Sequence, residues 1–246
     1  MTAGEAHGVR WGTATDRGSR RETNEDSHLA QFPVFAVADG MGGHEAGEVA
    51  SACAVDAFRS LVGPDTVTPD DVRAALAAAQ QSIREIPVES GAPPGTTLSG
   101  VVVVGSPRGR TWLVVNLGDS RTYRWADGAL ERVSVDHSEV EELVARGIIT
   151  PADARTHPRR HVVTRVLGGG RQDAPEPDFF ALPLAAGDEV VVCTDGLTDE
   201  VPESRIAEIL RHATGPQDAA DRLLAAALVA GGHDNITVLV VEALPD

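Results

Sequence analysis

The sequence has few cysteines and no long apolar segment. Its two cysteines, Cys53 and Cys193, stand in apolar surroundings, which argues against a disulfide framework and favours buried, unreactive thiols. The longest apolar runs are far shorter than the roughly 18 residues that a membrane span needs, and residues 1–12 contain no apolar signal region. We therefore expect a soluble, cytoplasmic chain without a membrane segment.

Positive charge is also scarce. The 246 residues include 21 Lys and Arg against 37 Asp and Glu, which gives a net charge of -16. Such a chain repels nucleic acid and anionic lipid, although an acidic excess can also contain a concentrated cation site. A hydrophobic fraction of 42% is ordinary for a globular protein, and no repeat or linker divides the sequence. We expect one monomeric domain over residues 1–246.

Seven segments have the alternating or β-branched pattern that is typical of strands. They are residues 9–15, 34–39, 97–105, 110–119, 120–125, 188–195 and 235–243. Several of these segments follow one another with no helix between them, and this order implies antiparallel sheets in an α+β fold.

Four helical segments come in two pairs. In the first pair, residues 46–61 and 68–86, apolar side chains recur at helical spacing, and Thr68 is suited to cap the second helix. The predicted buried faces are Ala46, Val49, Ala50, Cys53, Ala54, Ala57, Phe58 and Leu61, then Val72, Leu76, Ala79, Ile83 and Ile86. The second pair covers residues 202–212 and 217–230. Helix pairs separated by strands predict a layered sandwich with the sheets inside.

Between about residues 134 and 170 the strand pattern lapses. The stretch "TPADARTHPRRH" predicts a short capped helix and a polar loop over the surface, which we interpret as a flap. A basic group stands in this flap: His157, Arg159, Arg160 and His161.

Aspartates stand at the ends of several apolar runs. Asp39 and Asp195 each end such a run and precede a glycine. A single Asp-Gly is more often a hairpin turn than a ligand, but neither of these two leads into a second strand at hairpin register. Asp119 ends a third run and Asp234 precedes a fourth. The pattern indicates strands that present carboxylates.

Four converging carboxylates require a cation. Carboxylates about 4 Å apart repel one another by about 1 kcal/mol per pair in water, and by several times more when they are partly buried. Oxygen ligands without a cysteine or histidine set indicate Mg²⁺ or Mn²⁺ and not zinc. Two such ions can share a carboxylate and a bridging water, which becomes hydroxide near neutral pH and can attack phosphorus in line.

Six motifs cover nearly the whole chain. They are "DRGSRRETNEDS" (16–27), "VADGMGGHEAGEVAS" (37–51), "GTT" (95–97), "NLGDSR" (116–121), "CTDGLTDEV" (193–201) and "GGHDNITVLVV" (231–241). Together and in this order, they resemble the metal-dependent protein serine/threonine phosphatases of the 2C type, in their bacterial form. One motif alone is a weak signal, whereas six in the family's order are specific.

The resemblance implies a four-layer αββα sandwich with two Mn²⁺ or Mg²⁺ ions between the sheets. By motif position, Asp39 would bridge the ions and the carbonyl of Gly40 would bind one of them. Asp195 and Asp234 would bind the other ion, and Asp119 would form a weaker third site together with Asp195.

The same resemblance implies roles for a cluster near the N-terminus. Glu25 and Asp26 would hold metal-bound waters. Arg21 would hold the substrate phosphate, a task that suits a guanidinium fork, and its neighbour Arg20 is the alternative. The implied reaction is hydrolysis of phosphoserine and phosphothreonine on proteins by direct attack of a metal-bridging hydroxide, without a phosphoenzyme. The implied partners are phosphorylated proteins, including Ser/Thr kinases and their substrates.

One position departs from many eukaryotic members, which have a histidine directly after the Asp-Gly where Met41 stands here. The group that protonates the leaving oxygen is therefore unassigned. His44 is a candidate, although a histidine at a helix start is more often a capping or surface residue. We expect His233 to orient its loop rather than to bind metal. For the basic group of the flap, the alternatives are a solvated surface and steering of an acidic phosphopeptide.

Other phosphatase chemistries lack their motifs here. A cysteine phosphatase needs Cys-x5-Arg, but Asp199 stands six residues after Cys193, and the sequence contains no Asp-x-Asp-x-Thr, Gly-Asn-His-Glu, Gly-Lys-Ser/Thr or Gly-x-Ser-x-Gly. Three alternatives remain open. They are a phosphatase dedicated to one regulator, such as an anti-sigma antagonist, a non-catalytic pseudophosphatase that docks a partner, and a metal-stabilised structural module.

Overall fold

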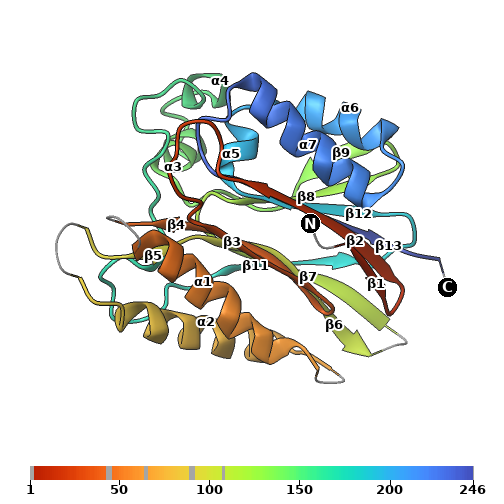
Figure 1. Cartoon of the computed structure of the whole chain (residues 1–246), viewed down its shortest axis with the longest axis horizontal. Helices are drawn as coiled ribbons and strands as arrows, with labels where there is room; N and C mark the ends of the chain where they lie inside the picture. Colours follow the sequence, from red (N-terminus) through yellow and green to blue (C-terminus); the bar gives the residue numbers. More distant parts are fainter. Residues whose placement is uncertain (1–2, 43–45, 64–65, 89–91, 107–108, 246) are drawn as a thin grey trace.

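Two antiparallel sheets lie face to face between two layers of helices (Figure 1). The computed structural model describes residues 3–42, 46–63, 66–88, 92–106 and 109–245. The first sheet has six strands in the order β1-β2-β13-β12-β8-β9, and the second has seven, in the order β10-β5-β4-β6-β7-β11 with β3 paired to β4. The predicted α+β class and the four-layer αββα sandwich are confirmed.

The strand bounds agree with the seven predicted segments to within two residues. In the first sheet they are β1 (Gly4–Ala6), β2 (Val9–Asp16), β13 (Ile236–Ala243), β12 (Glu189–Cys193), β8 (Arg121–Ala126) and β9 (Ala129–Arg132). In the second they are β10 (Leu167–Gly168), β5 (Gly95–Thr96), β4 (Val34–Met41), β6 (Leu98–Ser106), β7 (Gly109–Leu117), β11 (Asp178–Pro183) and β3 (Asp26–Gln31). The sequence patterns missed β1, β3, β5, β9, β10 and β11. Four of these strands have four residues or fewer, and the side chains of β3 and β11 are mostly half-exposed.

The helices cover the outer faces of the sheets in the two predicted pairs. The second sheet is covered by α1 (Ala46–Phe58), the 3-10 turn η1 (Arg59–Leu61) and α2 (Pro69–Arg84). The first sheet is covered by α6 (Glu203–His212) and α7 (Pro216–Ala230), and α5 (Asp195–Thr198) directly follows β12. Thr68 caps α2 in a reciprocal hydrogen-bonded box with Asp71, as its sequence position predicts. The prediction for Val49 was wrong, since its side chain is 44% exposed on the outer side of α1.

Strand β4 shows how the layers are held together. Phe35 and Val37 pack into the core between the sheets, whereas Val34, Ala36 and Ala38 pack against α1 and α2. Both faces of the strand are buried, so its sequence is a continuous apolar run rather than an alternating one. This burial fixes the strand on both sides and therefore fixes the position of the aspartate near its end.

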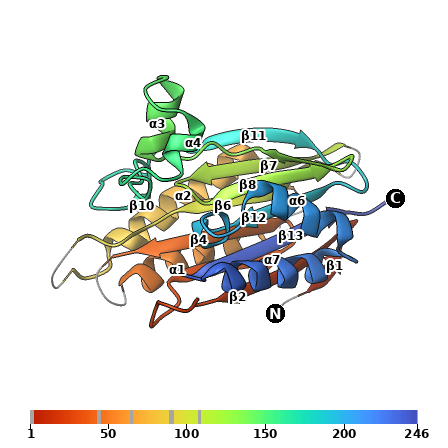
Figure 2. The same ribbon diagram turned by 90° about the horizontal axis from the view of Figure 1, so that it is seen from above.

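Residues 134–170, the flap, follow β9 of the first sheet and lead into the second sheet, and the helices of this segment project beyond the strands (Figure 2). Besides the predicted short helix α4 (Pro151–Ala154), the flap contains α3 (Glu139–Ala145), which the sequence analysis missed. Its base is closed by an antiparallel bridge between Ser138 and Val163 and by the N–H of Thr164, which donates to the carbonyl of His137. The flap is therefore anchored at its base by backbone hydrogen bonds.

Both cysteines are unpaired, in keeping with the absence of a disulfide framework. Cys193 is buried and Cys53 is half-buried. Burial raises the pKa of the Cys193 thiol to about 12, so the thiol stays protonated and unreactive near neutral pH. None of the helices that the structure describes is long and apolar enough to cross a bilayer.

Candidate metal and phosphate site

Four aspartates that are far apart in the sequence come together at one end of the sheets. Asp39 lies near the end of β4, Asp119 follows β7, Asp195 begins α5 after β12, and Asp234 precedes β13. Their proximity is reflected in the pKa of Asp39. Burial raises this pKa well above its ordinary value, and the charges of Asp26, Asp195, Asp119 and Asp234 raise it further.

The pKa values of the neighbouring carboxyl groups are raised as well. The pKa of Asp26 is raised to about 7, mainly by burial and then by the charges of Asp195 and Asp234, while hydrogen bonds from two threonines oppose the shift. The pKa of Asp195 is also raised to about 7, mainly by burial. Burial, followed by the charge of Asp195, raises the pKa of Asp119 well above its usual range. A cluster of half-buried acids with raised pKa values is typical of a functional site.

Two of these carboxylates carry an oxygen that has no hydrogen-bond partner within the described part of the chain. They are Asp26 Oδ1 and Asp195 Oδ1, both fully buried. The second oxygen of Asp26 accepts a hydrogen bond of 2.9 Å from the hydroxyl of Thr194. A buried, unpaired carboxylate oxygen is costly unless a cation or a donor meets it. The donor set and its unpaired oxygens thus fit divalent hard cations.

Backbone and hydroxyl contacts hold Asp39 in place. Its N–H donates to the hydroxyl of Thr97 over 3.0 Å, and its carbonyl accepts hydrogen bonds of 2.9 Å from the N–H of Thr97 and from the hydroxyl of Thr96. Asp26 lies directly opposite Asp39 in the β3–β4 pairing. Two of the clustered carboxylates therefore sit on adjacent, hydrogen-bonded strands.

Position 40 requires a glycine because α1 approaches the backbone of β4 closely there. A Cβ atom at this position would lie 2.1 Å from the carbonyl oxygen of Gly47, which no side chain tolerates. The N–H of Gly40 also donates to the carbonyl of Glu25 over 3.2 Å. The end of β4 is thus packed closely against both the helix and the loop that carries Glu25.

The N-terminal loop is held against Asp234 by Asn235 and by an ion pair. The side chain of Asn235 accepts a hydrogen bond from the N–H of Glu25 and donates to the carbonyls of Arg17 and Thr23. Arg21 Nη2 lies 2.7 Å from Asp234 Oδ2. The pKa of the half-buried Glu25 is raised, mainly by burial. Arg21 therefore points into the carboxylate cluster.

Arg20, the alternative phosphate ligand, is exposed, and so is Arg21. The ion pair with Asp234 nevertheless identifies Arg21 as the arginine that faces the cluster.

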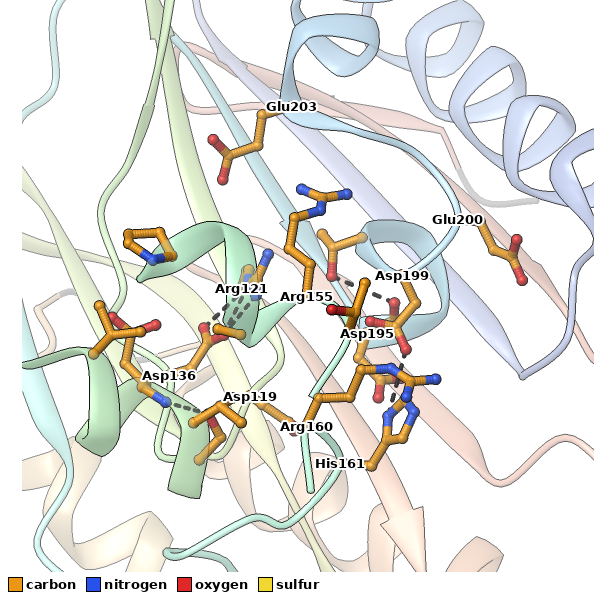
Figure 3. A pocket seen from close by; sticks show the side chains of 18 of the residues that line it. Asp119, Arg121, Asp136, Arg155, Arg160, His161, Asp195, Asp199, Glu200 and Glu203 are labelled. Carbon is orange, nitrogen blue, oxygen red and sulfur yellow. Dashed lines mark hydrogen bonds and ion pairs between the residues drawn. The ribbon is translucent and has the colours of Figure 1, made fainter. Parts of the chain in front are cut away.

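A cavity of about 1220 Å³ opens from the carboxylates toward the flap (Figure 3). Asp119, Asp195 and Asp234 line this cavity together with flap residues such as Arg155 and Arg160, whereas Asp39 and Asp26 are not among its lining residues. Arg121 and Asp136 also line the cavity, and Arg121 donates hydrogen bonds of 3.0, 3.0 and 2.6 Å to the carboxylate of Asp136. Three of the four aspartates therefore border a pocket that is large enough for a peptide side chain and its neighbours.

Comparison with known proteins identifies the family. The profile described as "Protein phosphatase 2C" matches residues 15–230. The chain belongs to the protein phosphatase 2C family. It is 38% identical over 242 residues to the serine/threonine protein phosphatase PstP of Mycobacterium tuberculosis, covering 95% of this chain and 45% of that protein. It is 36% identical over 239 residues to the serine/threonine phosphatase stp of Listeria monocytogenes, covering 93% of each. The chain thus spans about half the length of one relative and nearly all of the other.

Solved structures of the 2C family agree with this assignment. The crystal structure of M. tuberculosis PstP/Ppp matches with a TM-score of 0.87 at 36% identity and covers 96% of this chain and 99% of that one. The catalytic domain of PstP in complex with 2 manganese ions matches with a TM-score of 0.85 at 35% identity, covering 96% and 99%. The resemblance inferred from the six motifs is therefore confirmed.

A further group of potential metal ligands in this protein phosphatase 2C chain lies in the same cavity as Asp119. Among the described residues, one group of three has ligand atoms that all lie within 4.8 Å of one another: His161, Asp195 and Asp199. Asp119 lines the same cavity but is not a member of this group. Asp199 was missed in the sequence analysis, although its position four residues after Asp195 in "CTDGLTDEV" would have placed both on one helix face.

His233 and the basic group of the flap lie in different surroundings. His233 contacts Glu200 through its ring and through its backbone N–H, so it orients the loop before β13. His44 lies outside the described residues. In the flap, Arg159 pairs with Glu139, whereas Arg160 and His161 face the cavity. Only part of the basic group therefore borders the site.

A further residue that sequence analysis missed is His137, at the base of the flap. Its ring Nδ1 accepts a hydrogen bond of 3.2 Å from the N–H of Gly118, and its own N–H donates to the carbonyl of Gly118. Gly118 has a φ of 106°, which only glycine adopts readily, and directly precedes Asp119. His137 thus fixes the loop that presents Asp119. No signal in a single sequence marks this contact.

Proposed function

We propose that this chain is a Mn²⁺- or Mg²⁺-dependent phosphatase that hydrolyses phosphoserine and phosphothreonine on proteins. The observation that carries the proposal is the cluster of half-buried carboxylates, two of which have an unpaired buried oxygen, beside a cavity that Asp119, Asp195 and Asp234 line. Asp39, Asp195, Asp234 and the carbonyl of Gly40 would hold two ions, and Asp119 a third. Bound there, the ions would polarise the phosphate and lower the pKa of a water, which acts directly without a phosphoenzyme.

The protein's own residues would position the substrate and the water. Arg21 has a planar guanidinium with several N–H groups, one of which contacts Asp234, so further donors remain to hold the phosphate oxygens. Glu25 and Asp26 lie beside the cluster and would accept hydrogen bonds from ordered waters. The flap forms the outer wall of the cavity and limits access of bulk water.

The proposed substrates are phosphorylated proteins, including Ser/Thr kinases and their targets, in the cytoplasm. We propose that residues 1–246 act as one monomeric catalytic domain. The alternative, a phosphatase dedicated to one regulator, shares the same site and differs only in its range of substrates. A pseudophosphatase or a structural module is disfavoured because all the acidic residues expected of the active family are present.

Turnover of a phosphothreonine peptide in Mn²⁺ tests the proposal. We expect hydrolysis that stops in excess chelator and returns on adding Mn²⁺. Binding of Mn²⁺ without turnover of any phosphopeptide would contradict it and favour a structural module.

Arg21→Ala is expected to raise KM for a phosphothreonine peptide by about tenfold and to change kcat less. The reason is that the side chain holds the phosphate in the ground state as well as in the transition state, and a charge-assisted hydrogen bond contributes about 1.5–3 kcal/mol. Steady-state kinetics of Arg21→Ala and of the matched variant Arg20→Ala measure this effect. An unchanged KM in Arg21→Ala with a raised KM in Arg20→Ala would move the phosphate contact to Arg20.

A further inference from the structure

The loop that presents Asp119 is held from two sides by the first residues of the flap. Residues 118–120 connect β7 to β8, and we call them the Asp119 loop. Residues 135–138, which we call the entry segment, lead into the flap and lie beside this loop. The side chain of the buried Asn116, just before the loop, donates a hydrogen bond of 3.1 Å to the carbonyl of Val135. The two segments are therefore in direct contact beside a proposed metal ligand.

His137, in the entry segment, pairs with both backbone polar groups of Gly118. Its ring Nδ1 accepts a hydrogen bond of 3.2 Å from the N–H of Gly118, and its own N–H donates to the carbonyl of Gly118 over 2.9 Å. Gly118 has a φ of 106°, and a glycine can adopt several other conformations at little cost. The two hydrogen bonds select one of these conformations and thereby fix the direction in which the next residue, Asp119, leaves the loop.

A second contact lies on the other side of Asp119. Arg121 donates hydrogen bonds of 3.0, 3.0 and 2.6 Å to the carboxylate of Asp136, the residue before His137 (Figure 3). The side chain of Asp136 is 6% exposed, so water competes little for this charge-assisted pair. Two consecutive residues of the entry segment therefore hold the chain one residue before and two residues after Asp119.

The surroundings of His137 favour the tautomer that its contact with the loop needs. Ring Nε2 lies 3.2 Å from Asp178 Oδ2 at the start of β11, although the two atoms are not aligned as a hydrogen bond. The negative charge of Asp178 favours a proton on Nε2, which leaves Nδ1 free to accept from Gly118. Burial lowers the pKa of the His137 ring, so the ring is neutral at pH 7. His137 therefore serves the Asp119 loop as a hydrogen-bond acceptor rather than as a cation.

We propose that Asp136 and His137 are positioning residues that hold Asp119 in the orientation in which its carboxylate binds a metal ion. The inference rests on the proposed function, in which Asp119 holds a third ion. Neither Asp136 nor His137 is itself a ligand in this proposal, and both act through the Asp119 loop.

The entry segment also joins the Asp119 loop to the chain that returns from the flap. The carbonyl of His137 accepts a hydrogen bond of 2.7 Å from the N–H of Thr164, and Ser138 pairs with Val163. The entry segment thus lies between the loop and the returning chain. A displacement of the flap that breaks these contacts would release the Asp119 loop as well, so the affinity of Asp119 for its ion depends on the position of the flap.

The test compares two substitutions of His137 that preserve different halves of its ring. In His137→Asn the amide oxygen takes the place of Nδ1 and still accepts from Gly118, whereas in His137→Gln the amide reaches toward Asp178 and that acceptor is lost. In chelator, we expect the amide of Gly118 to exchange at least about tenfold faster in His137→Gln than in the wild type. In His137→Asn it should exchange at close to the wild-type rate. Amide exchange followed by NMR measures this effect, and circular dichroism checks the fold.

Calorimetric titration with Mn²⁺ shows whether the contact affects the metal. We expect His137→Gln to weaken one binding step by at least about tenfold, the same step that Asp119→Asn removes, and His137→Asn to titrate like the wild type. Adding His137→Gln to Asp119→Asn should change the titration no further, because a positioning residue acts only through the ligand that it positions.

Asp136→Asn tests the second contact, with Asp188→Asn as its matched control. Each substitution removes the charge of a buried aspartate that is hydrogen-bonded to an arginine, Arg121 for Asp136 and Arg124 for Asp188. Asp188, however, lies at the opposite end of β12 from the carboxylate cluster. We expect Asp136→Asn to weaken the same Mn²⁺ step as His137→Gln, and Asp188→Asn to leave the titration unchanged.

Three results would overturn the proposal. The first is wild-type exchange of the Gly118 amide together with a wild-type Mn²⁺ titration in His137→Gln. The second is an equal change in His137→Asn and His137→Gln, since the packing of the ring and not its acceptor would then hold the loop. The third is an additive effect of His137→Gln on the Mn²⁺ titration of Asp119→Asn.

Phosphopeptide turnover by the wild-type protein separates this inference from the proposed function. Binding of Mn²⁺ that depends on both Asp119 and His137, without any turnover, would support the positioning residues while contradicting the phosphatase. Turnover in Mn²⁺ with no effect of His137→Gln on Gly118 exchange or on Mn²⁺ binding would support the phosphatase and contradict the positioning residues.

Discussion

Asp39→Asn and Asp195→Asn are each expected to lower Mn²⁺-dependent hydrolysis of a phosphothreonine peptide by at least about a hundredfold, while the fold is retained. Each change removes a negative charge from a proposed metal ligand, and metal ions contribute several kcal/mol to stabilising the transition state, where about 1.4 kcal/mol corresponds to a factor of ten. Asparagine has nearly the same shape as aspartate, so packing around the site is preserved. Steady-state kinetics at saturating Mn²⁺ measures the effect.

Asp70→Asn is the matched control for these variants. Asp70 lies on α2 with a side chain that is 92% exposed, and we expect wild-type kinetics after its substitution. Normal turnover in both Asp39→Asn and Asp195→Asn would contradict the assignment of these residues to a metal site. Loss of turnover together with loss of the circular dichroism spectrum would indicate a structural role instead.

The metal-free protein is expected to lose stability as the pH rises from about 5 to 8. The pKa values of Asp26 and Asp195 are raised to about 7 in the folded chain, from an ordinary value of 3.8, and that of Asp39 is raised as well. The folded state therefore binds more protons than the unfolded state. Its stabilisation from these groups is fully present below pH 4 and is lost as the pH passes through about 7. In chelator, we expect the Tm to fall by at least about 5 °C over this range.

Two comparisons test whether the carboxylate cluster causes this fall of the Tm with pH. Saturating Mn²⁺ should raise the Tm more at pH 8 than at pH 5, since the ions neutralise carboxylates that are charged at the higher pH. Asp39→Asn should flatten the decline of Tm in chelator, because it removes one of the mutually repelling charges, whereas Asp70→Asn should not. A Tm in chelator that is constant from pH 5 to 8 would show that the acids do not repel one another in the fold.

The layered fold was largely predictable because its main elements have strong periodic patterns. The run that forms β4 is apolar on both faces, and the buried face of α2 recurs at helical spacing, so both signals are local. Strand β3 was not predictable in the same way. Its sequence "DSHLAQ" is half-exposed and polar, and its place in the sheet comes from pairing with β4. Val49 was assigned to the buried face of α1 from spacing alone, but packing leaves it at the margin.

The residue types of the candidate site were predictable from the sequence, whereas the way these residues are positioned was predictable only in part. Aspartates at strand ends indicated a cation site, and the resemblance of the six motifs to the family identified the individual residues of that site. The partners that position these aspartates come from distant parts of the chain. Asn235 joins the loop of Glu25 to Asp234, and His137 fixes the glycine before Asp119. Such contacts depend on tertiary packing, which leaves no periodic signal in the sequence.

The flap was predicted as a segment, but the basic side chains of the flap that face the cavity were not. "HPRRH" indicated a basic surface, either solvated or steering the substrate. The structure divides this group between Arg159, which pairs with Glu139, and Arg160 and His161, which line the cavity. Which side chain faces inward depends on the path of the loop after α4. That path is set by the contacts at the flap base, and these lie outside the motif.

Anomalous diffraction from a crystal of this protein grown with Mn²⁺ tests the central claim most directly. The account predicts two strong peaks at the end of β4. Asp39 should contact both ions, and Asp195 and Asp234 should both contact the same one of the two. Peaks confined to other surfaces, or full occupancy of Mn²⁺ elsewhere with none beside Asp39, would contradict it.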